Sequence, residues 1–200
     1  MVSHLVFDLG GVIVELGGSP IKNEWIPGTL SQDEAWQQWL TSTAPREFES
    51  GKTSPTQFAE QLVAELKLFI SPTEFLDHFL HWPIGPFPGA VEMLHSLGSR
   101  YRTALFSNSN ELHWNRKMGE MQLDRVFHER FASHLMGLVK PDAAAFEYVI
   151  SALGVEPGRI LFLDDNQINV DAATEAGMRA QRVQGLSELQ ACLREHDINW

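Results

Sequence analysis

The stretch Leu5–Leu16, which reads LVFDLGGVIVEL, constrains the fold of this chain more than any other. Its first apolar residues end in an acid and two glycines, a pattern typical of a buried strand that runs into a loop. Asp8 therefore lies where a strand leaves the core. A carboxylate there is unfavourable unless a cation, a metal ion or several hydrogen bonds compensate its charge. The glycines that follow let the backbone turn sharply and approach a ligand closely.

After Leu16 the pattern changes from strand to helix, from about Lys22 to His81. Three capping-box sequences predict helix starts in this segment: Ser31 with Glu34, Ser54 with Gln57, and Ser71 with Glu74. The apolar residues between them recur at helical spacing, and we expect most of the many aromatic residues to form its core. We therefore predict a small all-helical domain over residues 16–83.

From the segment PIGPFPG, residues Pro83–Gly89, to the end of the chain, strand and helix patterns alternate. We expect helices at Ala90–Leu97, Glu111–Lys117, Ala143–Leu153, Val170–Ala176 and Ser187–Glu195, and strands at Thr103–Phe106, His128–Ala132, Ile160–Leu163 and Arg179–Val183. This alternation predicts an α/β fold, a Rossmann-like parallel sheet with helices on both faces. The α/β core would comprise residues 1–15 and 84–200, with the helical domain inserted between them.

Composition limits the kinds of partner that the protein can have. The chain of 200 residues has 26 acids against 15 bases and a net charge of −11, so it would be repelled by nucleic acid and by acidic membranes. No uncharged apolar run approaches the roughly 20 residues that cross a bilayer, and the start of the chain lacks the pattern of a secretory signal. Cys192 is the only cysteine, which is compatible with a reducing compartment. We expect a soluble, cytoplasmic protein.

Polar residues follow several predicted strands, at the edge of a parallel sheet where ligands bind. Each of them alone has a common structural explanation, such as a helix cap for Ser107 or Asn108 or a solvated charge for Lys140. Asp142, just before a predicted helix, could cap that helix. Together, at one edge of one sheet, the strand-end residues favour a ligand site: Asp8, Ser107, Asn108, Lys140, Asp164 and Asp165.

This set of residues is suited to phosphate chemistry. Clustered carboxylates suit Mg²⁺, which prefers one or two carboxylates together with water and substrate phosphate. A carboxylate can also attack phosphorus and form an aspartyl-phosphate, which divides one difficult displacement into two easier ones. A lysine, a hydroxyl and backbone N–H groups can bind the phosphoryl oxygens and stabilise the transition state.

The same residues carry a resemblance to a known family. Asp8 in FDLGGV, Ser107 in FSNSN, Lys140 in VKP and Asp164–Asp165 in FLDDNQINV resemble the four ordered motifs of the haloacid dehalogenase-like (HAD) hydrolase superfamily. The helical insertion resembles the small cap domain of its subfamily IA. Within the family, the chain resembles the small bacterial phosphatases that act on α-D-glucose 1-phosphate and related sugar phosphates.

The resemblance implies a Mg²⁺-dependent phosphatase that acts on a small phosphorylated metabolite, as a monomer or a homodimer. It implies that Asp8 is the nucleophile and a metal ligand, and that Lys140 is catalytic. The implied metal ligands are Asp8, the Gly10 carbonyl and Asp165, with Asp164 supporting the metal beside them. The implied phosphate-binding residues are Leu9, Gly10, Ser107, Asn108 and Lys140.

Gly10 departs from the family pattern, because most phosphatases of the family carry there a second aspartate that acts as general acid and base. Such an acid is typically worth about 10²–10⁴-fold in rate. We therefore expect a preference for good leaving groups, as in glucose 1-phosphate, unless Glu15 or a cap side chain supplies the proton. Two alternatives stay open: a 2-haloacid dehalogenase, which uses no metal, and a degenerate scaffold that binds a phosphorylated ligand or a partner without turnover.

Overall fold

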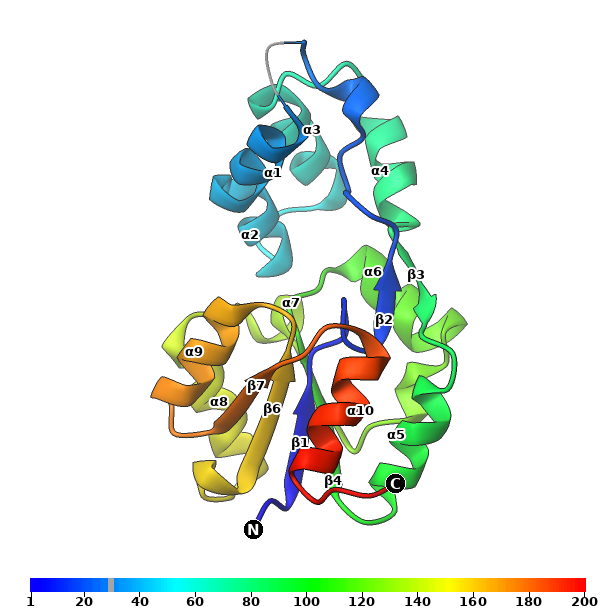
Figure 1. The fold of residues 1–200 in the computed structure, drawn as a ribbon. Coiled ribbons are helices and arrows are strands. Elements are labelled where there is room, and N and C mark those ends of the chain that lie inside the picture. The colour runs from blue at the N-terminus through cyan, green and yellow to red at the C-terminus, as the bar shows by residue number, and fades with distance from the viewer. Residues whose placement is uncertain (29–30) are drawn as a thin grey trace.

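Five parallel strands form the central sheet of the protein (Figure 1), in a computed structural model that describes residues 1–28 and 31–200. The strands lie in the order β5-β4-β1-β6-β7. Their bounds are His4–Phe7 for β1, Arg102–Ser107 for β4, Glu129–Ala132 for β5, Ile160–Asp164 for β6 and Arg179–Arg182 for β7. Every neighbouring pair is parallel, as the alternation of strand and helix predicts.

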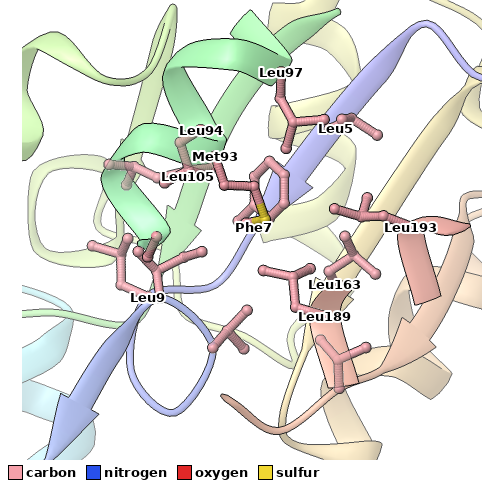
Figure 2. Packing of buried hydrophobic residues seen from close by; sticks show 14 of the residues in the cluster. Leu5, Phe7, Leu9, Met93, Leu94, Leu97, Leu105, Leu163, Leu189 and Leu193 are labelled. Atoms are coloured by element: carbon pink, nitrogen blue, oxygen red, sulfur yellow. The ribbon is translucent and has the colours of Figure 1, made fainter. Parts of the chain in front are cut away.

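Helices cover both faces of this sheet because the buried strand residues alternate in direction. Leu5 and Phe7 of β1 pack with α5 (Ala90–Gly98) and α10 (Gly185–Glu195), as Figure 2 shows. Val6 points to the other face, where it packs with α8 (Ala143–Leu153) and α9 (Gln167–Glu175). The predicted α/β sheet with two covered faces is confirmed.

The strand order creates a topological switch point at the carboxyl ends of the central strands, β1 and β6. The chain leaves β1 toward β4 and β5 on one side, and it later leaves β6 toward β7 on the other side. In open α/β sheets, ligands bind in the crevice beyond the carboxyl ends of the strands at such a point. Asp8 directly follows β1, Asp164 is the last residue of β6 and Asp165 directly follows it, so the acids come from both strands at this crevice.

The helical segment between β2 (Val14–Leu16) and β3 (Pro83–Pro86), which we call the cap, has a hydrophobic core of its own. Its helices are η1 (Asn23–Trp25), α1 (Gln32–Thr41), α2 (Thr43–Glu49), α3 (Pro55–Glu65) and α4 (Pro72–Leu80). All three predicted capping boxes are present, at the starts of α1, α3 and α4. Aromatic side chains dominate the packing, with the Phe48 and Phe58 rings stacked 4.5 Å apart.

The antiparallel pair of β2 and β3 joins the cap to the rest of the chain, which we call the core. The sequence pattern did not predict β3, because PIGPFPG is typical of a break rather than a strand. Proline is tolerated here, since the sheet has only two strands and both are edges. The predicted boundaries, 15/16 and 83/84, fall within this strand pair.

The segment after β4 differs from the single helix predicted at Glu111–Lys117. There α6 (Glu111–Asn115) is followed by a π-helical turn, η2 (Arg116–Glu120), and by η3 (Leu123–Arg125). The remaining short elements are α7 (Ser133–Met136) and η4 (Pro157–Arg159). Among the described residues, no helix is long and apolar enough to cross a membrane.

Candidate active site

Lys140 and two carboxylates form the buried centre of the site. The Lys140 Nζ donates hydrogen bonds to Asp8 Oδ1 over 2.7 Å and to Asp164 Oδ2 over 2.6 Å. Its third bond, of 2.9 Å, goes to the carbonyl oxygen of Phe106 at the end of β4. These acceptors use all three N–H groups of the ammonium. The Lys140 and Asp164 side chains are 1% exposed and that of Asp8 is 11% exposed, so Asp8 is the acid within reach of a ligand.

The charges of this centre depend on one another. Burial raises the pKa of Asp8 above its ordinary value, and the Lys140 ammonium opposes that shift. Burial also disfavours the charged form of Lys140, but the Asp164 and Asp8 carboxylates outweigh it, and the pKa of Lys140 is raised. Lys140 therefore stays protonated at neutral pH and favours the carboxylate form of Asp8.

Lys140 binds one oxygen of Asp8 and leaves the other, Oδ2, without a hydrogen-bond donor in the described part of the chain. Asp8 lines a cavity of about 600 Å³ between the core and the cap. A carboxylate that is fixed at one oxygen and unpaired at the other is arranged to act as a nucleophile toward a group bound in that cavity.

Asn108 and Asp164 position Lys140. The Asn108 side chain donates to the Lys140 carbonyl oxygen over 3.0 Å and accepts from the Lys140 N–H over 2.9 Å. Asp164 Oδ1 accepts from the backbone N–H of Asn166 and from the side chain of Asn169, so both of its oxygens are occupied. The Asn108 amide is therefore engaged in positioning the loop of Lys140, and α6 is capped by Asn110 instead.

Asp165 lies on the other side of Asp8, against the loop that follows β1. Gly11 has a φ of +73°, and a Cβ added there would lie 2.3 Å from Asp165 Oδ2, so only glycine lets this carboxylate approach the loop. Burial, together with the charges of Asp8 and Asp164, raises the pKa of Asp165 to about 7. Asp8, Asp164 and Asp165 place three carboxylates around the single Lys140 ammonium, and this excess of negative charge fits a divalent cation.

The residues present fit Mg²⁺ as a site of two carboxylates and one carbonyl oxygen. The Gly10 carbonyl accepts no hydrogen bond from the described residues and follows Asp8 by two positions. In that part of the chain, no three His, Cys, Asp or Glu side chains are grouped as a metal site, and Mg²⁺ needs only one or two carboxylates. Because Asp164 is engaged by Lys140, we reduce the proposed ligands to Asp8, Gly10 and Asp165.

Backbone amides near Asp8 are available to an anion. The N–H groups of Leu9, Gly10 and Asn108 donate to no acceptor among the described residues. The Leu9 side chain is fully buried in the core, so its predicted contact with phosphate can come only from its backbone. Ser107, at the end of β4, is buried and lines the same cavity. These groups could bind the oxygens of a phosphoryl group.

Sequence reasoning did not find four ionisable residues of the cavity: Glu49 of α2, His113 of α6, Lys117 of η2 and Arg182 of β7. Lys117 is only 4% exposed and makes no ion pair with a described residue. Burial lowers the pKa of Lys117, and the charges of Asp8 and Glu49 oppose that shift. No sequence signal identified Lys117, because a single lysine in a predicted helix is usually exposed.

His113 connects the core to the cap. Its Nε2 lies 2.6 Å from the carbonyl oxygen of Phe79 on α4, and its ring lies 4.3 Å from the Phe79 ring. Burial lowers the pKa of His113 to about 3, so the ring is neutral at physiological pH. A neutral ring that donates from Nε2 to a carbonyl is a structural contact rather than an acid or base.

Comparison with known proteins agrees with this geometry. The haloacid dehalogenase-like hydrolase family matches residues 2–177. D-ribitol-5-phosphate phosphatase of Bacteroides thetaiotaomicron is 25% identical over 188 residues, 88% of this chain and 89% of that protein. (S)-2-haloacid dehalogenase 4A of Burkholderia cepacia is 23% identical, over 89% of this chain and 81% of that protein.

Solved structures share the fold. A HAD-family enzyme of Bacteroides thetaiotaomicron, in complex with magnesium and inorganic phosphate, superposes with a TM-score of 0.75 at 21% identity. The superposition covers 92% of this chain and 95% of that one. The resemblance inferred from the four motifs is therefore confirmed: this chain belongs to the haloacid dehalogenase-like hydrolase family.

Proposed function

We propose that the protein is a Mg²⁺-dependent phosphatase that hydrolyses small phosphate monoesters through an aspartyl-phosphate on Asp8. The hydrogen bonding of the Asp8 carboxylate supports this proposal most strongly. Its Oδ1 is bound to Lys140, and its Oδ2 has no hydrogen-bond donor among the described residues and lies at a cavity of about 600 Å³. The phosphatase names of several relatives support the reaction class.

In the proposed reaction, Asp8 Oδ2 attacks phosphorus and the bond from phosphorus to the leaving oxygen breaks. Lys140 favours the ionised form of Asp8 and orients it, while Ser107 and the backbone amides bind the phosphoryl oxygens. When bound by Asp8, Gly10 and Asp165, Mg²⁺ would supply positive charge that reduces the repulsion between the anionic nucleophile and substrate. Water then attacks the aspartyl-phosphate and releases phosphate.

The substrate class that we propose is a small phosphorylated sugar or polyol, with glucose 1-phosphate as one candidate. The cavity wall contributed by the cap is aromatic and comprises Trp39, Phe79 and Trp82, whereas the core contributes polar groups. The relative named for D-ribitol 5-phosphate supports this class. A cytoplasmic location and a monomeric or homodimeric state stay predictions.

Phosphate release from a panel of sugar and polyol phosphates, with Mg²⁺ and with excess EDTA, tests the proposal. The native protein should release phosphate only with the metal, and Asp8→Asn should lower kcat by at least about 10³-fold. Asp77→Asn, which changes an exposed acid on α4, is the matched control and should leave the rate unchanged. Full activity of Asp8→Asn would reject the nucleophile assignment.

A second candidate reaction is dehalogenation of 2-haloacids, which the relative from Burkholderia cepacia favours. The excess of carboxylates over the Lys140 ammonium, with Asp165 beside Asp8 and Asp164, argues for the metal-dependent reaction instead. Chloride release from 2-chloropropionate in EDTA would decide for the dehalogenase. Inactivity on both kinds of substrate would support the non-catalytic scaffold.

A further inference from the structure

Glu49, the last residue of α2, lines the same cavity as Asp8. Figure 1 shows α2 at the end of the cap that faces the core, beyond the carboxyl ends of the strands. Glu49 lines the cavity of Asp8, and it also lines an adjoining one of about 450 Å³ that it shares with Asn108 and Lys140. A cap residue thus brings a carboxyl group to the reacting centre.

The Glu49 carboxyl group makes no hydrogen bond or ion pair with a described residue. The charges that face it are those of Lys117 from η2, Lys140 and Asp8 from the core, and Arg46 from its own helix. Burial raises the pKa of Glu49 to about 7, although the three cations oppose this shift. Glu49 can therefore either donate or accept a proton near neutral pH.

Contacts between the cap and the core fix the position of α2. Arg46 forms an ion pair with Asp142, the residue before α8. Asp142 occupies the N-cap position as predicted, but its carboxylate pairs with Arg46 and makes no capping hydrogen bond. Gly51 has a φ of +72°, and a Cβ added there would lie 2.6 Å from the His134 carbonyl oxygen of α7. These contacts, in the last turn of α2 and just after it, flank Glu49 and hold it over the core.

We propose that Glu49 is the general acid and base of the reaction and replaces the carboxylate that Gly10 lacks. This inference rests on the proposed phosphatase function. In the first step Asp8 Oδ2 bonds to phosphorus, the bond to the leaving oxygen breaks with its electron pair, and Glu49 donates its proton to that oxygen. In the second step the Glu49 carboxylate accepts a proton from water as the water oxygen bonds to phosphorus. The bond from phosphorus to Asp8 Oδ2 breaks with its electron pair, so that phosphate leaves and both residues are restored.

The inference changes the expectation drawn from Gly10. We expect a preference for good leaving groups only if the cavity holds no acid near the leaving oxygen. Under this inference, Glu49 is such an acid. The native protein should therefore hydrolyse alkyl phosphates such as glucose 6-phosphate as well as glucose 1-phosphate. The preference for good leaving groups should appear only when Glu49 is replaced.

The test measures kcat/KM of native protein and Glu49→Gln over phosphate esters whose leaving groups differ in basicity. For alkyl phosphates, Glu49→Gln should lose about 10²–10⁴-fold, since the leaving oxygen needs a proton. For p-nitrophenyl phosphate the loss should be less than about 10-fold, because that leaving group departs as an anion. This ratio reports the steps through bond cleavage, so slow hydrolysis of the aspartyl-phosphate does not obscure the comparison.

Two further variants sharpen the test. Glu47→Gln makes the same change on the same helix, outside both cavities, and should match the native protein on every ester. Gly10→Asp should restore part of the lost alkyl phosphatase activity to Glu49→Gln. The site can accept this change, because a Cβ at Gly10 would make an ordinary 3.4 Å contact with Leu16.

The outcomes separate this inference from the proposed function. If Glu49→Gln equals the native protein, or loses the same factor on every ester, Glu49 is not the general acid, although the phosphatase proposal survives. If the native protein hydrolyses no phosphate ester with Mg²⁺, both proposals are rejected. A loss that grows with the basicity of the leaving group supports the inference.

Discussion

Lys117 is a buried cation without an ionic partner in the described part of the chain, and such groups destabilise a fold. The protein tolerates it beside the reacting centre, where an anionic substrate can pair with it. Lys117 would thus contribute local positive charge that a protein of net charge −11 needs in order to bind an anion.

We predict that Lys117→Met stabilises the fold while it impairs activity. Replacing a buried charge by an apolar side chain of similar length should stabilise the protein by about 1–2 kcal/mol, which is about 2–8 °C in Tm for this size. The KM for phosphate esters should rise at least about 10-fold, because the substrate loses a charged contact. Calorimetry and steady-state kinetics measure the two effects.

Lys52→Met, at an exposed position, is the control for Lys117→Met and should change neither quantity. A Lys117→Met variant that is less stable than the native protein and binds substrate normally would assign Lys117 a structural role instead.

We predict that the raised pKa of Glu49 makes the free energy of unfolding depend on pH. Its folded pKa of about 7 lies above the ordinary 4.5, so the folded state keeps a proton that the unfolded state releases. Folding stability from this group is therefore lost as pH rises from about 4.5 to 7, by up to about 3 kcal/mol at 1.4 kcal/mol per pKa unit. Glu49→Gln should remove that loss.

The measurement is the free energy of unfolding of Glu49→Gln minus that of the native protein, from denaturant titrations between pH 4.5 and 8. This difference should be near zero at pH 4.5, rise toward neutrality and then stay constant. Other titrating groups cancel in the comparison, and Glu47→Gln should show no such trend. A difference that does not change with pH would show that Glu49 has an ordinary pKa in the folded protein.

At the scale of elements, the strands of the central sheet and the residues at their ends were predictable because both depend on local patterns. Apolar runs of four or five residues bounded by polar residues predict buried parallel strands, and the switch point then brings Asp8, Lys140 and Asp164 together. The capping boxes were equally local, which is why α1, α3 and α4 begin where the sequence predicts.

The elements that depend on distant contacts could not be predicted. β3 exists because Pro83–Pro86 pairs with β2 across the cap, and its sequence alone favours a break. The π-helical turn that places Lys117 in the cavity is an irregularity of packing. The roles of Asn108 and Asp142 also depend on partners far along the chain. Asn108 binds the backbone of Lys140, and Asp142 pairs with Arg46. The sequence alone therefore could not decide whether either residue caps a helix or has another role.

The ion pair of Arg46 with Asp142 allows a test of how α2 is held. Both side chains are about half exposed, at 53% and 41%, so the pair should stabilise the fold by less than about 1 kcal/mol. Arg46→Met should nevertheless lower kcat/KM for alkyl phosphates at least about 10-fold, because small displacements of a catalytic group are costly. The measurement is steady-state kinetics with a thermal melt.

Arg102→Met is the matched control for Arg46→Met. It breaks another exposed ion pair, with Glu129, at the opposite end of the sheet from the cap. Loss of activity in Arg102→Met, or full activity in Arg46→Met, would contradict the view that this contact positions α2.

At the scale of the whole molecule, the core and the cap divide the chemistry between them. The core provides the proposed nucleophile, the lysine that orients it and the proposed metal ligands, all at the switch point of one sheet. The cap provides aromatic walls and the carboxyl group of Glu49. The site is therefore complete only when β2 and β3 hold the cap over the core.

Mass spectrometry of protein quenched in acid during turnover detects whether Asp8 attacks phosphorus. With Mg²⁺ and a sugar phosphate, the native protein should carry one phosphoryl group on the peptide that contains Asp8, and Asp8→Asn should carry none. A phosphoryl group on another residue, or active turnover with an unmodified Asp8 peptide under conditions that preserve acyl phosphates, would contradict the account.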